Sequence, residues 1–355
     1  MSSPIPVNLL TGFLGSGKTT LLRHILACSD YADCAVLINE FGEIGIDHHL
    51  IERVEGEVML MRSGCVCCTI RDDLAGAIHS LYDRREAGTA PPFRRLIIES
   101  TGLADPTPIL ATVMNDTVIR HHFRLGNVIA TVDAVNGRRH LDCQPESVKQ
   151  VAVADRLLIT KVDLAAKEDV DRLEQRLAGI NAVAPCFRSA NSAPPLAVFL
   201  EQDAFDATGR SVEMRRWLAA ESQADHHDRA ADGISGDPVR HLKESQHDSR
   251  IHAFAMTFQG PVNWSAFGIW FTLLLQAHGD DVLRVKGILN VAGLPTPVAI
   301  HGVQHLVHPP VHLETWPDEE RRSRIVFIVR DIAREDIERS FAAFQKALGP
   351  EDLAA

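Results

Sequence analysis

The chain has little of what a membrane protein or a nucleic-acid-binding protein needs. Its longest apolar run, residues 270–275, falls well short of the roughly 18 residues that a membrane-spanning helix requires. Basic residues are also scarce, because 36 Lys and Arg face 47 Asp and Glu, for a formal net charge of −11. We therefore expect neither a membrane nor a nucleic acid as partner.

The N-terminus lacks the features of a secretory signal. No basic segment precedes the first apolar run, and Lys18 follows it. Without an export signal, we expect a cytoplasmic protein whose seven cysteines are reduced. Internal repeats are absent as well, and a composition of 45% hydrophobic and 23% charged residues is ordinary for a globular protein. A length of 355 residues predicts two domains or three.

Short apolar runs alternate with helical patterns over the first 190 residues. Runs without polar alternation suit strands buried on both faces, and we expect strands at 6–10, 35–38, 96–99, 128–132 and 157–159. Helical periodicity occurs at 19–27, 72–85, 108–120 and 167–177. Strands that alternate with helices predict an α/β domain with a mostly parallel sheet and right-handed crossovers.

The composition changes at about residue 203. Residues 203–250 are rich in Asp, His, Ser and Gly, and they hold too few large apolar side chains to offset their ordering entropy, which predicts a mobile linker. Extended patterns follow at 251–258, 282–291, 298–303, 311–316 and 325–329, with helical patterns at 264–277 and 334–348. We therefore expect an α/β domain at 1–202, a His-rich linker at 203–250 and a smaller α+β domain at 251–355.

A glycine-rich phosphate loop, GFLGSGKT, occupies residues 12–19 and matches G-x-x-x-x-G-K-[ST] at every fixed position. It directly follows an expected buried strand and opens a helix, so backbone N–H groups and the helix N-terminus can surround phosphates. In this motif Lys18 reaches the β- and γ-phosphates and the Thr19 hydroxyl binds Mg²⁺. The expected nucleotide contacts are Gly12, Gly15, Ser16, Gly17, Lys18, Thr19 and Thr20. The loop predicts a P-loop NTPase domain.

A second nucleotide element, LIIESTG, occupies residues 96–102. An apolar strand that ends in an acid, with Gly three residues later, is typical of the Mg²⁺-side strand of a nucleotide hydrolase. We expect Glu99 to hold the water shell of the metal and the Gly102 N–H to face the γ-phosphate. Lys18, Glu99 and Gly102 are thus the predicted catalytic residues.

The base is expected to be read by LLITKVD at 157–163, because a strand leading into [NT]-K-x-D is the guanine-reading element of GTPases. The Asp163 carboxylate can accept hydrogen bonds from guanine N1–H and the 2-amino group, a donor pair that adenine lacks. The stem of Lys161 can lie over the base. Thr160 stands where Asn is more usual, which removes one side-chain amide. A charged surface turn is the alternative, but the position of the motif in the alternating fold favours GTP.

Three thiols crowd into an expected loop, CVCC at 65–68, between an apolar run and a helical pattern. They can supply two or three soft ligands to one ion, whereas Zn²⁺ normally takes four. A disulfide between the adjacent cysteines would be strained, so we favour a metal over a redox pair or an apolar cluster. The candidate ligands are Cys65, Cys67 and Cys68, completed by a carboxylate or a histidine from elsewhere in the chain. Glu40 and Glu43 are candidates, because they lie in a segment where nucleotide-sensing loops lie in many GTPases.

Histidine is abundant, with 17 residues in the chain. The expected linker carries His226, His227, His241 and His247, and such a tract either binds metals loosely or is a solvated polar tether. The C-terminal region carries His301, His305, His308 and His312. Alternation along extended segments would place these four on two faces, so we expect mainly structural roles for them.

Together the motifs resemble one family. GFLGSGKT, NEFGEIGID, SGCVCC, IIESTGLADP and ITKVD occur in that order, and RVKGILNV and GVQHLVHPP follow near the C-terminus. This set resembles the CobW-like metal chaperones and insertases, within the wider group of P-loop GTPases that also holds the urease and hydrogenase nickel-maturation GTPases. The resemblance covers nearly the whole chain outside the expected linker, and Thr160 is its one departure.

The resemblance implies a slow GTPase that delivers a transition metal, often zinc, to a client metalloprotein. By matching position it implies a metal site at Glu40, Cys67 and Cys68, with Cys65 as a further or exchanging ligand. The implied cofactors are GTP, Mg²⁺ and Zn²⁺ or Co²⁺; the implied partner is a client, and a homodimer stays open. A small-molecule or nucleotide kinase is one alternative, although no convincing Arg-rich lid is present. A zinc-storage or zinc-sensing protein is another.

Overall fold

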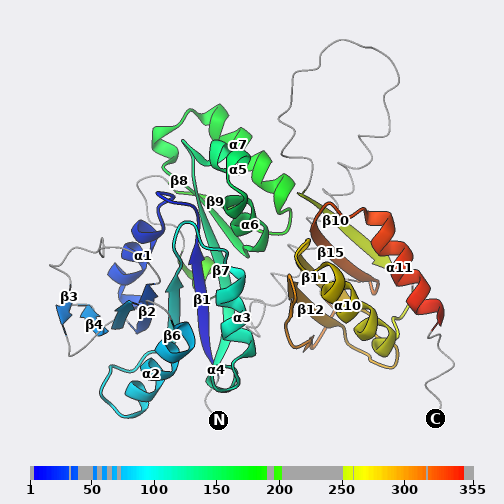
Figure 1. Cartoon of the computed structure of the whole chain (residues 1–355), viewed down its shortest axis with the longest axis horizontal. Coiled ribbons are helices and arrows are strands. Elements are labelled where there is room, and N and C mark those ends of the chain that lie inside the picture. The colour runs from blue at the N-terminus through cyan, green and yellow to red at the C-terminus, as the bar shows by residue number, and fades with distance from the viewer. Residues whose placement is uncertain are drawn as a thin grey trace. The chain divides into compact units, whose positions relative to one another are not determined.

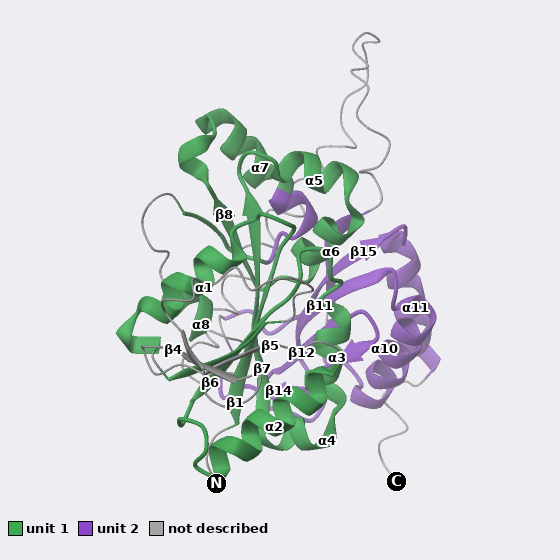
Figure 2. Ribbon diagram, turned by 60° about the vertical axis from the view of Figure 1, so that its left-hand side comes forward, with its two compact units in different colours: residues 1–176, 184–206 green, residues 177–183, 207–355 purple. Residues whose placement is uncertain are grey.

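The structure is a computed structural model of the chain, and it describes residues 4–31, 33–38, 51–53, 58–61, 66–69, 73–189, 196–201, 251–258, 260–316 and 319–347. The chain divides into two compact units, Met1–Arg176 with Ala184–Asp206, and Leu177–Val183 with Ala207–Ala355 (Figure 2). Among the described residues, no helix combines the length and the apolar character needed to cross a membrane.

A nine-stranded sheet of order β3-β4-β5-β2-β6-β1-β7-β8-β9 forms the frame of the first unit (Figure 1). Its strands are β1 (Ile5–Thr11), β2 (Cys34–Ile38), β3 (Ile51–Arg53), β4 (Val58–Met61), β5 (Val66–Thr69), β6 (Arg95–Glu99), β7 (Phe123–Asp133), β8 (Arg156–Thr160) and β9 (Cys186–Arg188). In this order, each pair of adjacent strands from β5 through β2, β6, β1, β7 and β8 to β9 is parallel. The pairs β3–β4 and β4–β5 are antiparallel. The predicted mostly parallel sheet is confirmed, and the apolar runs of β2 and β8 are buried along their whole length.

Helices connect these strands in the expected alternation. They are α1 (Lys18–Ala27), α2 (Leu74–Glu86), α3 (Thr107–Asn115), α4 (Thr117–His122), α5 (Gly137–Cys143), α6 (Pro145–Val153), α7 (Lys167–Ile180) and α8 (Leu196–Leu200). Leu22, Ile25 and Phe199 are among the residues that pack α1 and α8 against the sheet, and α3 and α6 lie on the other side of it in both views (Figures 1 and 2). The single helix expected at 108–120 is two helices, because the Asp116 carboxylate caps a new one by accepting N–H groups of α4.

The second unit is an antiparallel sheet of order β10-β15-β11-β12-β13, with β14 also pairing β12. Its elements are β10 (Ile251–Phe258), α10 (Trp264–His278), β11 (Val282–Leu289), β12 (Val298–Val303), β13 (Leu306–Val307), β14 (Val311–His312), β15 (Ser323–Arg330) and α11 (Arg334–Ala347). The apolar cluster between helices and sheet is rich in aromatic rings. At its centre, Trp270 of α10 donates its indole N–H to Ser340 of α11 over 2.9 Å. This α+β unit matches the expected class.

The structure differs from the sequence expectations at the cysteine segment. We expected a loop there, but residues 66–69 form β5, which pairs with β2 on one side and β4 on the other. Four residues are too few for a hydrophobic period to be recognised, and the strand exists because both neighbours supply backbone partners. Residues 203–250 lie outside the described residues, so the linker stays a prediction.

Candidate functional site

The phosphate loop links β1 to α1 through three glycines of positive φ. Gly12, Gly15 and Gly17 have φ values of 137°, 70° and 96°, a region that side chains rarely adopt. A Cβ atom on Gly12 would lie 2.4 Å from the Thr131 carbonyl oxygen, so only glycine fits there. The ammonium group of Lys18 donates to the Gly12 carbonyl at 2.9 Å and to the Phe13 carbonyl at 3.3 Å. The loop is therefore curled around its own lysine.

Thr19, in the first turn of α1, and Glu99, at the end of β6, meet beside this loop. The Thr19 hydroxyl donates to Glu99 Oε1 over 2.9 Å, and Glu99 is buried. The parallel pairing of β1 with β6 brings the two ends together, because Leu10 is in register with Glu99. Hydroxyl and carboxylate oxygens are the ligand types that Mg²⁺ prefers, so this pair fits that ion.

A chain of buried hydroxyl groups lies under the phosphate loop. The hydroxyls of Ser16 and Thr131 are 2.6 Å apart, and Thr131 donates in turn to the Thr11 carbonyl at 3.3 Å. The Ser100 hydroxyl donates to the Thr11 hydroxyl at 2.9 Å, and Thr160 donates to the Ser16 carbonyl at 2.7 Å. These five residues, the floor hydroxyls, are all buried. They connect the ends of β1, β6, β7 and β8 to the loop.

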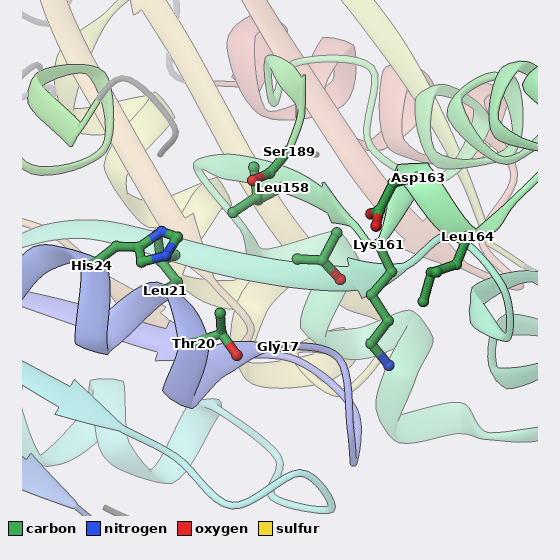
Figure 3. A pocket seen from close by; sticks show the side chains of 10 residues that line it. Gly17, Thr20, Leu21, His24, Leu158, Lys161, Asp163, Leu164 and Ser189 are labelled. Atoms are coloured by element: carbon green, nitrogen blue, oxygen red, sulfur yellow. The ribbon is translucent and has the colours of Figure 1, made fainter. Parts of the chain in front are cut away.

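A pocket of about 180 Å³ opens at the carboxyl end of β8. Its lining residues are Gly17, Thr20, Leu21, His24, Leu158, Thr160, Lys161, Asp163, Leu164 and Ser189. Figure 3 shows Lys161 and Asp163 at one end and His24 at the other, with Thr20 between them on the α1 side. The pocket thus joins the phosphate loop to the [NT]-K-x-D motif, as guanine binding requires.

Lys161 is held in a sparsely populated backbone conformation, with φ 55°. Its ammonium group donates to the buried Asp133 carboxylate at 2.7 Å. Although burial alone would raise the pKa of Asp133, hydrogen bonds from Lys161, from the Val135 N–H and from Asn136 hold that pKa below its usual range. The charged carboxylate therefore fixes the stem of Lys161 along the pocket wall.

Thr160 has a role that its replacement of Asn does not suggest. A Cβ atom on Gly17 would lie 3.2 Å from the Thr160 methyl group, so the side chain touches the phosphate loop as well as donating to it. Thr160 thus joins the end of β8 to the phosphate loop through its hydroxyl and its methyl group.

Gly102 lies against the phosphate loop. A Cβ atom added to Gly102 would lie 2.5 Å from the backbone nitrogen of Leu14. No side chain could occupy that space without moving the loop. The structure therefore brings all three predicted catalytic residues, Lys18, Glu99 and Gly102, to the same edge of the sheet.

The predicted metal site lies mostly outside the described residues. Cys65, Glu40 and Glu43 are not described, and for Cys67 and Cys68 only the backbone is described. Cys68 is in register with Leu37 of β2, and Thr69 with Ile38. Glu40 follows Ile38 by two residues. The strand that carries Cys67 and Cys68 therefore ends beside the end of β2.

Histidines do not form a metal cluster in the described part of the chain, where no group of three or more His, Cys, Asp or Glu could hold an ion. The rings of His301 and His308 lie 5.9 Å apart, and both residues are buried. His305 pairs instead with the Leu275 carbonyl at 2.8 Å. His226, His227, His241 and His247 lie outside the described residues.

Sequence reasoning missed several residues of the site. Thr131 and Asp133 end the buried strand β7, and the same pattern of polar residues closing an apolar run had identified Glu99. His24 carried no signal beyond its place on α1, six residues after Lys18. Ser189 follows the three-residue strand β9, which is too short to predict. The close packing of β8 and β9 brings Ser189 to the pocket.

Comparisons with known proteins identify relatives of both units. The profile of the CobW/HypB/UreG nucleotide-binding domain matches residues 6–188, and that of the cobalamin synthesis protein CobW C-terminal domain matches residues 251–345. The zinc chaperone YjiA of Escherichia coli is 34% identical over 345 residues, covering 97% of this chain and 100% of the relative. The zinc-regulated GTPase metalloprotein activator 1 of Schizosaccharomyces pombe is 28% identical, covering 81% of this chain and 72% of the relative.

A solved structure shares the fold as well. The crystal structure of Zn(II)-bound YjiA GTPase from E. coli superposes with a TM-score of 0.73 at 32% identity, covering 97% of this chain and 99% of that one. The nucleotide-binding match alone spans more than half of the 355 residues. The chain therefore belongs to the CobW/HypB/UreG family.

Proposed function

We propose that the protein is a GTP-hydrolysing metallochaperone, which binds a transition metal, zinc first among them, and delivers it to a client metalloprotein. The observation that carries the proposal is the hydrogen bond of 2.9 Å between Thr19 and Glu99 beside an unbroken phosphate loop. The names of its relatives, zinc chaperone and zinc-regulated GTPase metalloprotein activator, support the metal and the client.

Hydrolysis would use groups that are already arranged. Thr19 and Glu99 would hold Mg²⁺, which when bound supplies positive charge to the β- and γ-phosphates. Lys18 would exchange its two carbonyl acceptors for phosphate oxygens and so bring its charge to the transferred group. Backbone N–H groups of the loop would bind the remaining oxygens. Because these groups are already in place, they would need to move little when the nucleotide binds. Such preorganisation is the basis of electrostatic catalysis.

Guanine would be selected at the far end of the pocket. Asp163 would accept from N1–H and the 2-amino group of the base, and the Lys161 stem would cover one face, held by Asp133. An adenine in the same place offers no such donor pair. The contact from Thr160 to the loop would link base binding to the position of the phosphates.

The metal cargo would bind between the cysteine strand and the segment after β2, with Cys67, Cys68 and Glu40 as ligands and Cys65 as a further or exchanging ligand. Cys67 and Cys68 lie on β5, which runs parallel to β2, and Glu40 follows β2 by two residues in the sequence, which supports these three ligands. Thiolates are soft ligands that suit Zn²⁺. Because β2 also pairs with β6, which ends in Glu99, a nucleotide-driven change at β6 would reach the segment that contains Glu40.

Coupling between nucleotide and metal is testable by titration. We expect the zinc affinity, measured against a chromophoric chelator, to differ between the protein with a non-hydrolysable GTP analogue, with GDP and without nucleotide. Linkage requires zinc to change the affinity for the GTP analogue by the same factor. Equal zinc affinities in all three states would remove the coupling. A double variant Cys67→Ser, Cys68→Ser that still bound one tight ion would move the site elsewhere.

A GTPase assay with and without stoichiometric Zn²⁺ or Co²⁺ separates the proposal from its alternatives. A metallochaperone should release phosphate from GTP without any added acceptor, and the metal should change the rate. A kinase would need an acceptor molecule, and a storage protein would bind several ions independently of nucleotide. Capture of a client metalloprotein by a hydrolysis-blocked variant would then identify the recipient.

A further inference from the structure

The loop that follows Glu99 is tied to a helix that the nucleotide motifs do not include. Gln150, on α6, is buried with 1% of its surface exposed. Its side-chain amide donates to the Gly102 carbonyl at 3.2 Å and to the Ala104 carbonyl at 3.1 Å. One side chain therefore holds both ends of the loop segment that carries the predicted γ-phosphate contact.

The preceding residue of α6 adds an ion pair. Lys149 donates to Asp105 Oδ2 at 2.8 Å, and Asp105 Oδ1 accepts the Thr107 N–H at 2.9 Å. Although burial alone would raise the pKa of Asp105, the hydrogen bonds from Lys149 and Thr107 keep that pKa below its usual range. The carboxylate is thus charged at neutral pH, and it fixes the far end of the same loop.

Burying the amide of Gln150 is partly unfavourable for stability, so its two hydrogen bonds to the loop need to be weighed against that cost. No donor from the described residues reaches Gln150 Oε1, although this atom is buried, and an unsatisfied buried acceptor is unfavourable. A leucine of similar size would avoid that cost. What leucine lacks is the N–H pair on the two loop carbonyls, so positioning of the loop is the property that the glutamine provides.

The direction of the Gly102 peptide gives this anchoring a consequence. In a trans peptide the carbonyl and the following N–H point in opposite directions. Holding the Gly102 carbonyl on α6 therefore turns the Leu103 N–H away from α6. The same residue lies against the phosphate loop, where a Cβ on Gly102 would meet the Leu14 nitrogen at 2.5 Å. The loop thus contacts both α6 and the phosphate loop.

We propose that Gln150 is a positioning residue for the γ-phosphate: by holding the Gly102 and Ala104 carbonyls it presents the backbone N–H groups of this loop to GTP and has no counterpart role toward GDP. Lys149 and Asp105 secure the end of the same loop. The inference rests on the proposed placement of the nucleotide. It makes α6 the element through which the presence of the γ-phosphate is registered.

The test uses the full-length protein and measures affinities for a non-hydrolysable GTP analogue and for GDP. Gln150→Glu keeps the size of the side chain but replaces the donor with a carboxylate, and Gln150→Leu removes both polar atoms. For each we expect an affinity for the GTP analogue about tenfold lower, the size of one or two lost hydrogen bonds, with GDP affinity within about twofold of wild type. Glu146→Gln, on the first turn of the same helix, is the matched control and should leave both affinities unchanged.

Lys149→Met and Lys149→Arg add a second arm. The methionine variant should lower the ratio of GTP-analogue to GDP affinity, and the arginine variant, which retains the charge toward Asp105, should restore it. Equal losses for both nucleotides in the Gln150 variants, or no loss, would overturn the inference. If wild type fails to hydrolyse GTP, the proposed function fails instead, so the two failures are distinguishable. Thermal unfolding of each variant separates a misfolded protein from a specific effect.

Discussion

The floor of the phosphate loop consists of buried polar side chains, whereas the core of the second unit consists of apolar ones. Under the loop, the floor hydroxyls Thr11, Ser16, Ser100, Thr131 and Thr160 are buried and bonded to one another or to the backbone. In the second unit, Trp270 packs against Phe341 with ring centroids 4.8 Å apart, within a cluster of aromatic and aliphatic side chains.

The difference follows from what each region does. A net hydrogen bond contributes only about 1 kcal/mol to stability, but its direction fixes the position of two atoms, which a phosphate site needs. Apolar burial contributes more per side chain and has no direction. Substitutions in the floor should therefore change turnover more than stability, and substitutions in the aromatic core should do the reverse.

The largest effect should come from the aromatic core. Trp270→Ala removes a side chain that is 2% exposed and bonded to Ser340, and we expect it to lower the free energy of unfolding by about 3–5 kcal/mol. Calorimetry or denaturant unfolding measures this. Trp270→Phe retains a ring and should cost less. At temperatures where the variant stays folded, GTP hydrolysis should be near wild type; a large fall in turnover without unfolding would break the contrast.

Lys18→Ala should have the largest effect on chemistry. It removes the charge that would reach the transferred phosphoryl group, and we expect turnover to fall about 100- to 1,000-fold. The melting temperature should change little, because Lys18 donates to loop carbonyls and contributes no apolar packing. Phosphate release under saturating GTP is the measurement. Turnover within a few-fold of wild type would refute the assignment of this loop.

Asp163 tests base selection. Asp163→Ala leaves two guanine donors unpaired, and we expect GTP to lose about 1.5–3 kcal/mol of binding free energy while ATP is unaffected. Competition between the two nucleotides measures the preference directly. Wild-type protein should prefer GTP. Equal affinities for ATP and GTP would show that Thr160, in place of Asn, does not support guanine recognition.

Thr131 tests the role of the floor hydroxyls most directly, since it is one of them and does not belong to any nucleotide motif. Thr131→Val has nearly the same volume and loses the hydroxyl bonded to Ser16 and Thr11, and we expect kcat to fall about tenfold with a small change in melting temperature. Thr131→Ser keeps the hydroxyl and should restore most of the rate. Loss of rate in both variants would assign the effect to packing.

The smallest expected effect is on pH dependence. Because its hydrogen bonds hold the pKa of Asp133 below the usual range, the carboxylate stabilises the folded state above the ordinary aspartate pKa of about 4, and this contribution is lost as pH falls through the folded pKa. Asp133→Asn should therefore lose stability at neutral pH and show a flatter acid limb. Unfolding curves between neutral and acidic pH test this, and an unchanged acid limb would contradict it.

The phosphate loop could be predicted from the sequence because all of its parts lie in one short segment. A complete G-x-x-x-x-G-K-[ST] motif needs only the chain that contains it, because the glycines, the lysine and the helix start are contiguous. Strands buried on both faces could also be predicted, since β2 and β8 are apolar runs without polar alternation. The order of these elements was enough to predict a mostly parallel sheet.

The contacts between distant residues could not be predicted in this way. Gln150 reaches Gly102 across 48 residues, and Thr160 reaches Ser16 across 144. Neither contact has a local signature, because a side chain on a buried helix or strand end is indistinguishable from any other until the sheet order fixes its neighbour. The cysteine strand β5 likewise exists through its pairing with β2 and β4. Sequence periodicity predicts individual helices and strands, but it does not predict long-range hydrogen bonds, because these depend on the topology of the sheet.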